Sequence, residues 1–182
     1  CADYAFQQHI QKSLDLGNGR SISLWPHGIL FRDAETDMRR KMIEQDQVEC
    51  VIGLGPNLFY NSPMEACLLI TKTNKEESKK GKVLIINAVK EVRQDKNIAY
   101  LEQNHIERIY NAYSNYADEE GFSKVVTIDE VLKHKASLNM ALYVSNVDSS
   151  KVQISLDDAL ANWQISSKQL SNSMDQLFKE LG

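Results

Sequence analysis

Residues 19–61 read GRSISLWPHGILFRDAETDMRRKMIEQDQVECVIGLGPNLFYN, and this stretch decides the fold class. It opens with β-type residues at 21–25, which Pro26 closes because proline cannot donate to a sheet ladder. A charged segment at 35–46 has the periodicity of an amphipathic helix. The run at 48–54 is apolar almost throughout, which is typical of a central strand. Strand, helix and strand in this order predict an α/β sheet with right-handed crossovers.

The same alternation continues on both sides of this stretch. A helix is expected over 3–16, because Phe6, Ile10 and Leu14 recur at a spacing of four and would form its buried stripe. Ile106, Ile109, Tyr110 and Tyr113 mark a helix over 102–116 in the same way. The other expected elements are strands at 66–71 and 82–88, and a mixture of short strand and turns at 125–144.

Two charged segments are expected to face solvent. In the helix at 35–46, the inward residues should be Met38, Met42 and Ile43, and the outward ones Arg39, Arg40 and Lys41. The link 72–81 is rich in lysine and glutamate and is expected to be a solvated hairpin tip. The lysines that could touch phosphates there are Lys75, Lys79, Lys80 and Lys82. Glu76 and Glu77 dilute that positive charge, which favours an ordinary solvated loop.

Composition limits the class of protein. The chain has 182 residues, 42% of them hydrophobic and 25% charged, which is typical of a globular protein. A net charge of −4 argues against a free-standing nucleic-acid binder, although a basic partner subunit could supply contacts. No apolar run reaches membrane-spanning length, so no membrane association is expected. Cys1, Cys50 and Cys67 are too far apart for a metal cluster, and their small number suits a reducing cytoplasm.

The C-terminal segment has a different pattern. Residues 146–151 are polar and are expected to form a hinge between a domain at 1–145 and an arm at 146–182. The residues that then alternate at spacings of four and three are Leu156, Leu160, Trp163, Ser167, Leu170, Met174, Leu177 and Leu181. This pattern predicts the seam of a coiled-coil-like helix. Such a helix either folds back on its own domain or docks on another subunit.

Motifs for cofactor binding and catalysis are not completed in this sequence. Gly53 and Gly55 resemble the start of a dinucleotide fingerprint, but no third glycine and no helix follow at the required distance. The segments 55–57 and 61–63 combine proline and asparagine in the wrong order for the Asn-Pro-Pro-aromatic motif of amino-methylating enzymes. We therefore assign no catalytic, cofactor-binding or metal-binding residue within this chain.

Phe59 and Tyr60 are the strongest candidates for a substrate contact. They follow a buried strand directly and are flanked by Asn57 and Asn61. A loop in that position can present a ring face to an extruded base, and each stacked base contributes about 1–3 kcal/mol. The alternative is that one of the two rings plugs the core beneath the loop.

His27 and Arg32 are the remaining candidates. His27 lies between Pro26 and Gly28 at the C-terminal end of a strand, where α/β proteins place ligands. No nucleophile or carboxylate is spaced to form a triad with it, so its expected role is to shape a turn. Arg32 is the basic residue that we favour for a contact with a DNA backbone.

Several short motifs, taken in order, resemble one family. They are DYAF at 3–6, PHG at 26–28 with LFR at 30–32, VIGL at 51–54, PNLFYN at 56–61, KVLIINA at 82–88 and EGFS at 120–123. Together they closely resemble the modification subunit of type I restriction–modification systems, an adenine-specific DNA methyltransferase. The resemblance spans nearly everything from residue 3 to about 145.

The resemblance implies a fold, a cofactor and partners. The fold is the C-terminal half of a Rossmann-like sheet of S-adenosylmethionine-dependent methyltransferases, with 66–71 as the antiparallel closing strand and a C-terminal helical arm. Phe59, Tyr60 and Asn61 would lie where the family's aromatic residue stacks on the flipped adenine. The implied partners are DNA, a specificity subunit, a second modification subunit and the restriction (nuclease) subunit.

The chain is expected to be a fragment of that enzyme. The methyl-donor motif and the Asn-Pro-Pro-aromatic motif are both absent from it, so the chain alone should neither bind S-adenosylmethionine nor methylate DNA. Two alternatives stay open. One is a non-catalytic assembly module that recruits partner subunits, and the other is a methyltransferase acting on RNA or protein.

Overall fold

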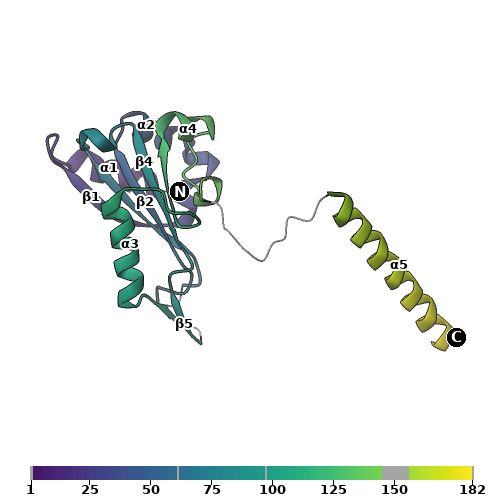
Figure 1. Cartoon of the computed structure of the whole chain (residues 1–182). Helices are drawn as coiled ribbons and strands as arrows, with labels where there is room; N and C mark the ends of the chain where they lie inside the picture. Colours follow the sequence, from purple (N-terminus) through teal and green to yellow (C-terminus); the bar gives the residue numbers. More distant parts are fainter. Residues whose placement is uncertain (1, 61, 97, 145–155, 182) are drawn as a thin grey trace. The chain divides into compact units, whose positions relative to one another are not determined.

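The computed structural model describes residues 2–60, 62–96, 98–144 and 156–181. The chain divides into two compact units, residues 1–146 and 147–182, which are described separately below (Figure 1). The first unit contains the sheet with its covering helices, and the second contains one long helix. Within the described ranges, no helix is both long and apolar enough to cross a membrane.

The first unit is built on a mixed sheet of five strands in the order β1-β3-β2-β4-β7. The strands are β1 (Arg20–Pro26), β2 (Val48–Leu54), β3 (Ala66–Lys72), β4 (Lys82–Ala88) and β7 (Ser123–Thr127). β2 runs parallel to β4, and β3 runs antiparallel to both β1 and β2. β2 is buried along its whole length, which confirms the predicted central strand. The predicted α/β class with an antiparallel strand at 66–71 is also confirmed, and that strand lies between β1 and β2.

The link between β3 and β4 is not a hairpin, and this part of the prediction is wrong. β2 lies between the two strands in the sheet, so the link 73–81 crosses from one side of β2 to the other. It contains a short 3₁₀ turn, Glu77–Lys79. The error arises because a polar link between two strands has the same composition whether the strands are adjacent or separated by another strand.

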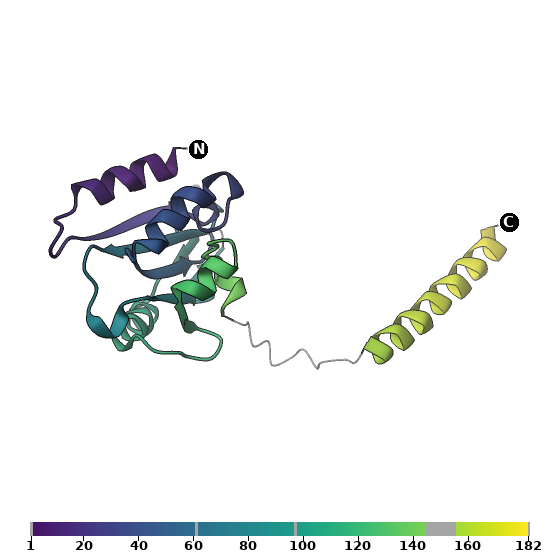
Figure 2. The same ribbon diagram turned by 90° about the horizontal axis from the view of Figure 1, so that it is seen from above.

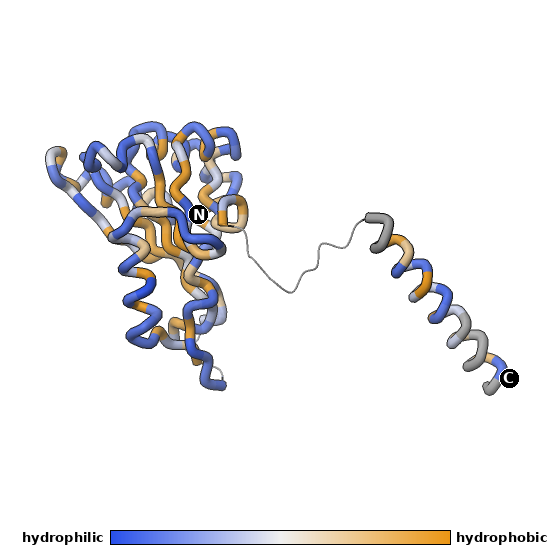
Figure 3. The backbone as a smooth tube through the Cα atoms, in the orientation of Figure 1, coloured by the Kyte–Doolittle hydropathy of each residue, from blue (hydrophilic) through white to orange (hydrophobic). Residues whose placement is uncertain are grey.

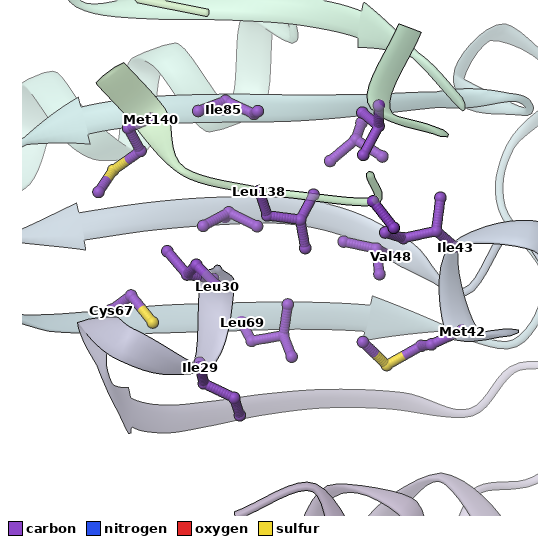
Figure 4. Packing of buried hydrophobic residues seen from close by; sticks show 14 of the residues in the cluster. Ile29, Leu30, Met42, Ile43, Val48, Cys67, Leu69, Ile85, Leu138 and Met140 are labelled. Atoms are coloured by element: carbon purple, nitrogen blue, oxygen red, sulfur yellow. The ribbon is translucent and has the colours of Figure 1, made fainter. Parts of the chain in front are cut away.

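Helices cover both faces of the sheet and enclose two separate cores. α1 (Asp3–Ser13), α2 (Thr36–Glu44) and α4 (Ile128–Lys133) lie over one face, and α3 (Gln103–Asn115) lies over the other (Figure 2). The first core joins Met42 and Ile43 to apolar strand residues such as Leu69 and Ile85 (Figure 4). Apolar residues concentrate along these strands, and polar residues are frequent along the helices that cover them (Figure 3).

The buried face of α1 is not the predicted stripe. Phe6 is 62% exposed, whereas Tyr4 and Gln7 are buried. The reason lies on β1, where Ser23 Oγ and Trp25 Nε1 each donate a hydrogen bond to Gln7 Oε1, at 2.9 and 2.8 Å. Because the surface of β1 is polar here, Gln7 makes the contact that the periodicity assigned to Phe6.

Arg39 on α2 is buried, which contradicts the prediction that it faces solvent. Its guanidinium donates to the carbonyl oxygens of Ala136 at 2.6 Å and of Ile29 at 3.2 Å. These carbonyls belong to turns whose oxygens have no helix or sheet partner of their own, and a buried arginine supplies several donors at once. Met42 and Ile43 are buried as predicted, but Met38 is 41% exposed.

The prediction for α3 is half right. Ile109 and Tyr113 pack against the second core, whereas Ile106 and Tyr110 are exposed. Among the residues of this helix, Ala112 is the one that is buried, and it belongs to the second core.

The remaining short elements lie around the ends of the strands. Residues expected to be strand and turns at 125–144 form β7, α4 and a 3₁₀ turn, Met140–Leu142. Two 3₁₀ turns, His27–Leu30 and Asp33–Glu35, follow β1. A two-stranded hairpin of β5 (Arg93–Asp95) and β6 (Ile98–Tyr100) follows β4. This hairpin was not predicted, because neither of its strands is longer than three residues.

The second unit consists of α5 (Leu156–Leu181), so the predicted C-terminal helix is confirmed. The predicted hinge at 146–151 lies outside the described residues. Seam residues whose side chains are described are all exposed: Leu160, Trp163, Ser167, Leu170 and Met174.

Candidate functional site

One edge of the sheet collects most of the candidate residues. β1 and β2 both run antiparallel to β3, and β4 runs parallel to β2, so the C-terminal ends of β1, β2 and β4 meet at the same edge. We call it the carboxyl edge, made of the turn at 27–30, the loop at 55–65 and the segment 89–100. Open α/β sheets bind their ligands at such an edge.

The loop at 55–65 presents its aromatic residues outward. Tyr60 is 95% exposed and Phe59 is 38% exposed. Leu58 packs against the second core, and the Ser62 amide donates to the Phe59 carbonyl at 3.0 Å, which closes a tight turn. Neither aromatic ring plugs the core, so that alternative is wrong, because Leu58 fills the position beneath the loop. Asn61, the third candidate of this loop, lies outside the described residues.

A pocket of about 420 Å³ opens beside these rings. It is lined by Asn57, Leu58, Phe59, Tyr60, Ser62, Pro63 and Ile98. Ile98 belongs to the β5–β6 hairpin, and the adjacent Ala99 amide donates to the Asn57 carbonyl at 3.0 Å. The hairpin and the aromatic loop are therefore hydrogen-bonded to each other, and both line this pocket.

His27 joins the end of β1 to the start of β3. Its Nδ1 lies 2.8 Å from Glu65 Oε2, and its backbone amide donates to the Glu65 carbonyl at 3.2 Å. The ring of Phe31 packs at a right angle to the imidazole, with 5.8 Å between ring centroids. These contacts give His27 a role in shaping the turn. Sequence reasoning missed Glu65, because only the pairing of Pro26 with Ala66 across the sheet brings it to His27.

A second, smaller cavity of about 180 Å³ lies beside His27 and Glu65. Its polar lining comes mainly from Asn87, Lys90 and Asn139. The His27 Nε2 atom is buried and has no hydrogen-bond partner among the described residues. His27 and the aromatic loop thus share the carboxyl edge but line separate pockets.

Arg32 contacts other residues of the chain. Its Nη1 lies 2.7 Å from Asp3 Oδ2 and 3.6 Å from Glu35 Oε1. The hydrogen bond to Asp3 raises the pKa of the arginine. Its side chain packs closely against Gly28, where a Cβ atom would lie 2.7 Å from Arg32 Nε. Arg32 ties α1 to the turn after β1, and the structure does not bring it to the aromatic pocket.

Charged and phenolic groups gather at the opposite end of β2, which we call the amino edge. Glu49 is 1% exposed, and its Oε1 accepts a hydrogen bond from the Tyr113 hydroxyl at 2.6 Å. Lys79 lies 3.5 Å from the same carboxylate and above the rings of Tyr113 and Tyr116. Burial, together with the bond to Glu49, raises the pKa of Tyr113 well above its ordinary value.

Lys75 is a buried part of this amino edge. Its Nζ lies 2.5 Å from Asp46 Oδ1 and 2.7 Å from the Lys82 carbonyl, and its side chain is 1% exposed. Burial lowers the pKa of Lys75, against the opposing effect of Asp46. The prediction of a solvated loop is therefore wrong for Lys75 and for the largely buried Lys79, and neither is free to contact phosphates.

The cysteines and acidic residues do not assemble a metal site in the described ranges, where no group of three potential ligands comes together. Cys50 and Cys67 are free and buried, and burial raises the pKa of the Cys67 thiol to about 12. A thiol with that pKa is protonated at neutral pH and acts as a small apolar residue.

Gly53 and Gly55 are packed against protein. A Cβ atom at Gly53 would lie 2.1 Å from Met140 Sδ, and one at Gly55 would lie 2.6 Å from the Val89 carbonyl oxygen. The space that a nucleotide-like ligand would need beside these glycines is filled by this chain's own atoms.

Comparison with protein families gives a match over most of the chain. The model of the N-6 DNA Methylase family matches residues 1–169. The type I restriction enzyme MjaVIII methylase subunit of Methanocaldococcus jannaschii is 38% identical over 154 residues, covering 82% of this chain and 26% of that protein. The MjaVII methylase subunit of the same organism is 34% identical over the same coverage. The chain thus spans about a quarter of the length of these relatives.

Solved structures give the same result for the fold. The type I restriction-modification methyltransferase subunit from Streptococcus thermophilus superposes with a TM-score of 0.74 at 34% identity, over 80% of this chain and 31% of that one. The EcoKI M protein superposes with a TM-score of 0.61 at 18% identity, over 100% of this chain and 44% of that one. The second similarity concerns the fold alone.

Proposed function

This chain belongs to the N-6 DNA methylase family, and we propose that it is part of the modification subunit of a type I restriction–modification system. The complete subunit would transfer a methyl group from S-adenosylmethionine to the N6 amino group of an adenine flipped out of the DNA. Within it, this chain would supply the C-terminal strands of the sheet and the aromatic loop that receives the base.

The observation that carries this proposal is the exposure of Phe59 and Tyr60 at the carboxyl edge. Neither ring belongs to the core clusters, and the loop that holds them is fixed by Leu58 and by the Ser62 hydrogen bond. A fixed loop with exposed rings beside a pocket suits stacking on an unpaired base. In an N-6 DNA methylase, the base to be stacked is adenine.

The methyl donor does not fit the residues of this chain. Gly53 and Gly55, the GxG stretch at the end of a buried strand, are both packed against the chain's own atoms. We therefore propose that S-adenosylmethionine is held by parts of the complete subunit outside this chain. The contribution of the present residues is to hold and orient the base while excluding water from one side of it.

Substitution of the two rings tests this function. In the complete subunit, Phe59→Ala and Tyr60→Ala should each lower kcat/KM for DNA methylation by roughly 5- to 150-fold, the equivalent of about 1–3 kcal/mol of lost stacking. Phe6→Ala is a matched control, because Phe6 is also well exposed but lies on α1. Unchanged kinetics in both loop variants would remove the base-stacking role.

The chain alone should be inactive. We expect residues 1–182 to transfer no methyl group from radiolabelled S-adenosylmethionine to DNA under conditions in which the complete subunit does so. Activity of the isolated chain would contradict the proposal that the donor is held elsewhere.

The free, buried thiols of Cys50 and Cys67 support a reducing, cytoplasmic setting.

We further propose that α5 binds the specificity subunit of the complex. Its exposed residues Leu160, Leu170 and Met174 fall on one stripe of the helix, and an exposed apolar stripe of this kind marks a site of contact with another protein. A second modification subunit and the nuclease subunit would join the same assembly. This helix is also what an assembly module would need, so subunit binding by itself does not distinguish the two functions.

Charge substitutions on α5 test the subunit contact. Leu170→Asp with Met174→Asp should abolish co-elution with the specificity subunit and leave the thermal unfolding of the first unit unchanged. Ile165→Asp is the matched control, because Ile165 is also exposed but lies roughly 140° around the helix from Leu170. A lower unfolding temperature of the first unit would mean that the helix belongs to its own core.

A further inference from the structure

The β5–β6 hairpin carries an apolar residue that the first unit does not bury. Ile98 is 67% exposed, whereas the next residue, Ala99, is 3% exposed. Side chains of a strand alternate between its two faces, so Ala99 faces the protein and Ile98 points away from that contact. The exposure of Ile98 therefore follows from the way the hairpin is attached.

That attachment is to the aromatic loop. The Ala99 amide donates to the Asn57 carbonyl at 3.0 Å, two residues before Phe59. Asn57 has a left-handed backbone with a φ of 61°, a conformation that asparagine tolerates better than most residues. The hydrogen bond thus joins the hairpin to a sharply bent part of the loop, and it brings Ile98 into the lining of the pocket formed by Phe59 and Tyr60.

The apolar side chain of Ile98 favours a base over a phosphate as the group that it contacts. Arg93 lies 2.7 Å from Glu102 and stacks near the ring of Tyr100, so its charge is already balanced. Ile98 itself offers only apolar surface. An apolar side chain beside two aromatic rings gains from burying a flat, weakly polar ring, and gains nothing from a phosphate.

We propose that Ile98 is a further wall of the base pocket and packs against the extruded adenine together with Phe59 and Tyr60. This inference rests on the proposed function, because it presupposes that the aromatic loop receives the base. It adds a residue about 40 positions along the chain from that loop, on a hairpin that the sheet does not include. The hairpin would help to hold the base outside the DNA double helix.

The test uses the complete subunit in its DNA-methylating complex, with duplex DNA carrying 2-aminopurine at the target adenine. Fluorescence of this base analogue reports its removal from the stack, and methylation of unmodified DNA gives kcat/KM. Ile98→Ala should reduce the fluorescence change on binding and lower kcat/KM by roughly 3- to 20-fold, since it removes apolar contact of the order of a few methylene groups. Ile98→Leu should restore most of both signals.

Ile106→Ala is the matched control, because Ile106 is 46% exposed on α3 and contributes nothing to this pocket. Thermal unfolding of every variant checks folding, and Ile98→Ala should leave it unchanged because the side chain is exposed. Wild-type signals in Ile98→Ala, together with losses in Phe59→Ala and Tyr60→Ala, would overturn this inference and leave the base site standing. Wild-type signals in all three variants would overturn the base site itself.

Discussion

The side chains at the two ends of β2 differ in their surroundings. At the amino edge, Lys75 pairs with Asp46, and Glu49 pairs with both Tyr113 and Lys79. At the carboxyl edge, Phe59, Tyr60 and Ile98 leave apolar surface in solvent. One strand therefore begins in a self-contained polar network and ends beside an open pocket.

The difference separates stability from recognition. A buried polar network lowers the free energy only when every member keeps its partner, so substitutions at the amino edge should destabilise the fold. The Tyr60 ring is almost fully exposed and contributes little to folding, so its substitution should leave stability unchanged and affect only the binding of a base. The first unit thus allows each end of β2 to be tested with its own measurement.

The largest effect is expected from Asp46→Asn, which would break the amino edge. It removes the charge that compensates Lys75, whose side chain is 1% exposed, and should lower the free energy of unfolding by about 2–4 kcal/mol. Urea unfolding of the chain measures this change. Asp33→Asn is the control, because Asp33 is exposed, and should change stability by less than about 0.5 kcal/mol. If the two substitutions changed the free energy of unfolding equally, the Lys75–Asp46 ion pair would not stabilise the fold.

A smaller effect is expected from Gly55→Ala, which sharpens the comparison at the other end of β2. The new methyl group would lie 2.6 Å from the Val89 carbonyl oxygen, and relieving that overlap should cost about 1–3 kcal/mol. The shift would also separate the loop from the segment that leads to the hairpin, so the 2-aminopurine signal should fall as well. Gly17→Ala, where the nearest atom is the flexible Asp15 carboxylate at 3.2 Å, should affect neither measurement.

Tyr113→Phe should destabilise the first unit by about 1 kcal/mol. It removes the hydroxyl that donates to Glu49 at 2.6 Å, while the ring stays in place beneath Lys79. Tyr110→Phe on the same helix is the control, because Tyr110 is 66% exposed. DNA methylation by the complete subunit should be unchanged in both variants. If Tyr113→Phe lowered methylation but left stability unchanged, the assignment of stability to the amino edge and of recognition to the carboxyl edge would be contradicted.

The smallest effect is a pH dependence carried by Lys75. Burial lowers its pKa, so the folded chain holds this proton less tightly than the unfolded chain does. The cost of burying the charged lysine is therefore fully present below the folded pKa, and it is relieved as pH rises toward the unfolded value of about 10.4. Between pH 7 and 10, the wild-type chain should gain stability relative to Lys75→Met. A difference that stays constant with pH would contradict the lowered pKa.

Much of the sheet could be predicted from the sequence. Strands at 48–54, 66–71 and 82–88 were located because continuous apolar runs of that length have few other structures open to them. The turn at Pro26 and the long C-terminal helix were located for similarly local reasons, namely a missing donor and a regular spacing.

Predictions failed where a side chain's surroundings come from distant residues. The buried Arg39 donates to the carbonyl oxygens of Ile29 and Ala136, and the buried Lys75 donates to Asp46. No local sequence pattern identifies these partners. Gln7 is buried in place of Phe6 because β1 presents polar groups to α1. In each case, a hydrogen bond between distant segments outweighed the intrinsic preference of the side chain for water or for the core.

The sequence by itself determined the α/β class, the central strand and the place of Phe59 and Tyr60 after it, because hydrophobic periodicity and turn residues act locally. Only the tertiary structure decided that both rings are exposed, that Glu65 meets His27, and that Ile98 joins the aromatic pocket. The physical reason is that strand order and register bring together residues far apart in the chain, and no local spacing encodes those meetings.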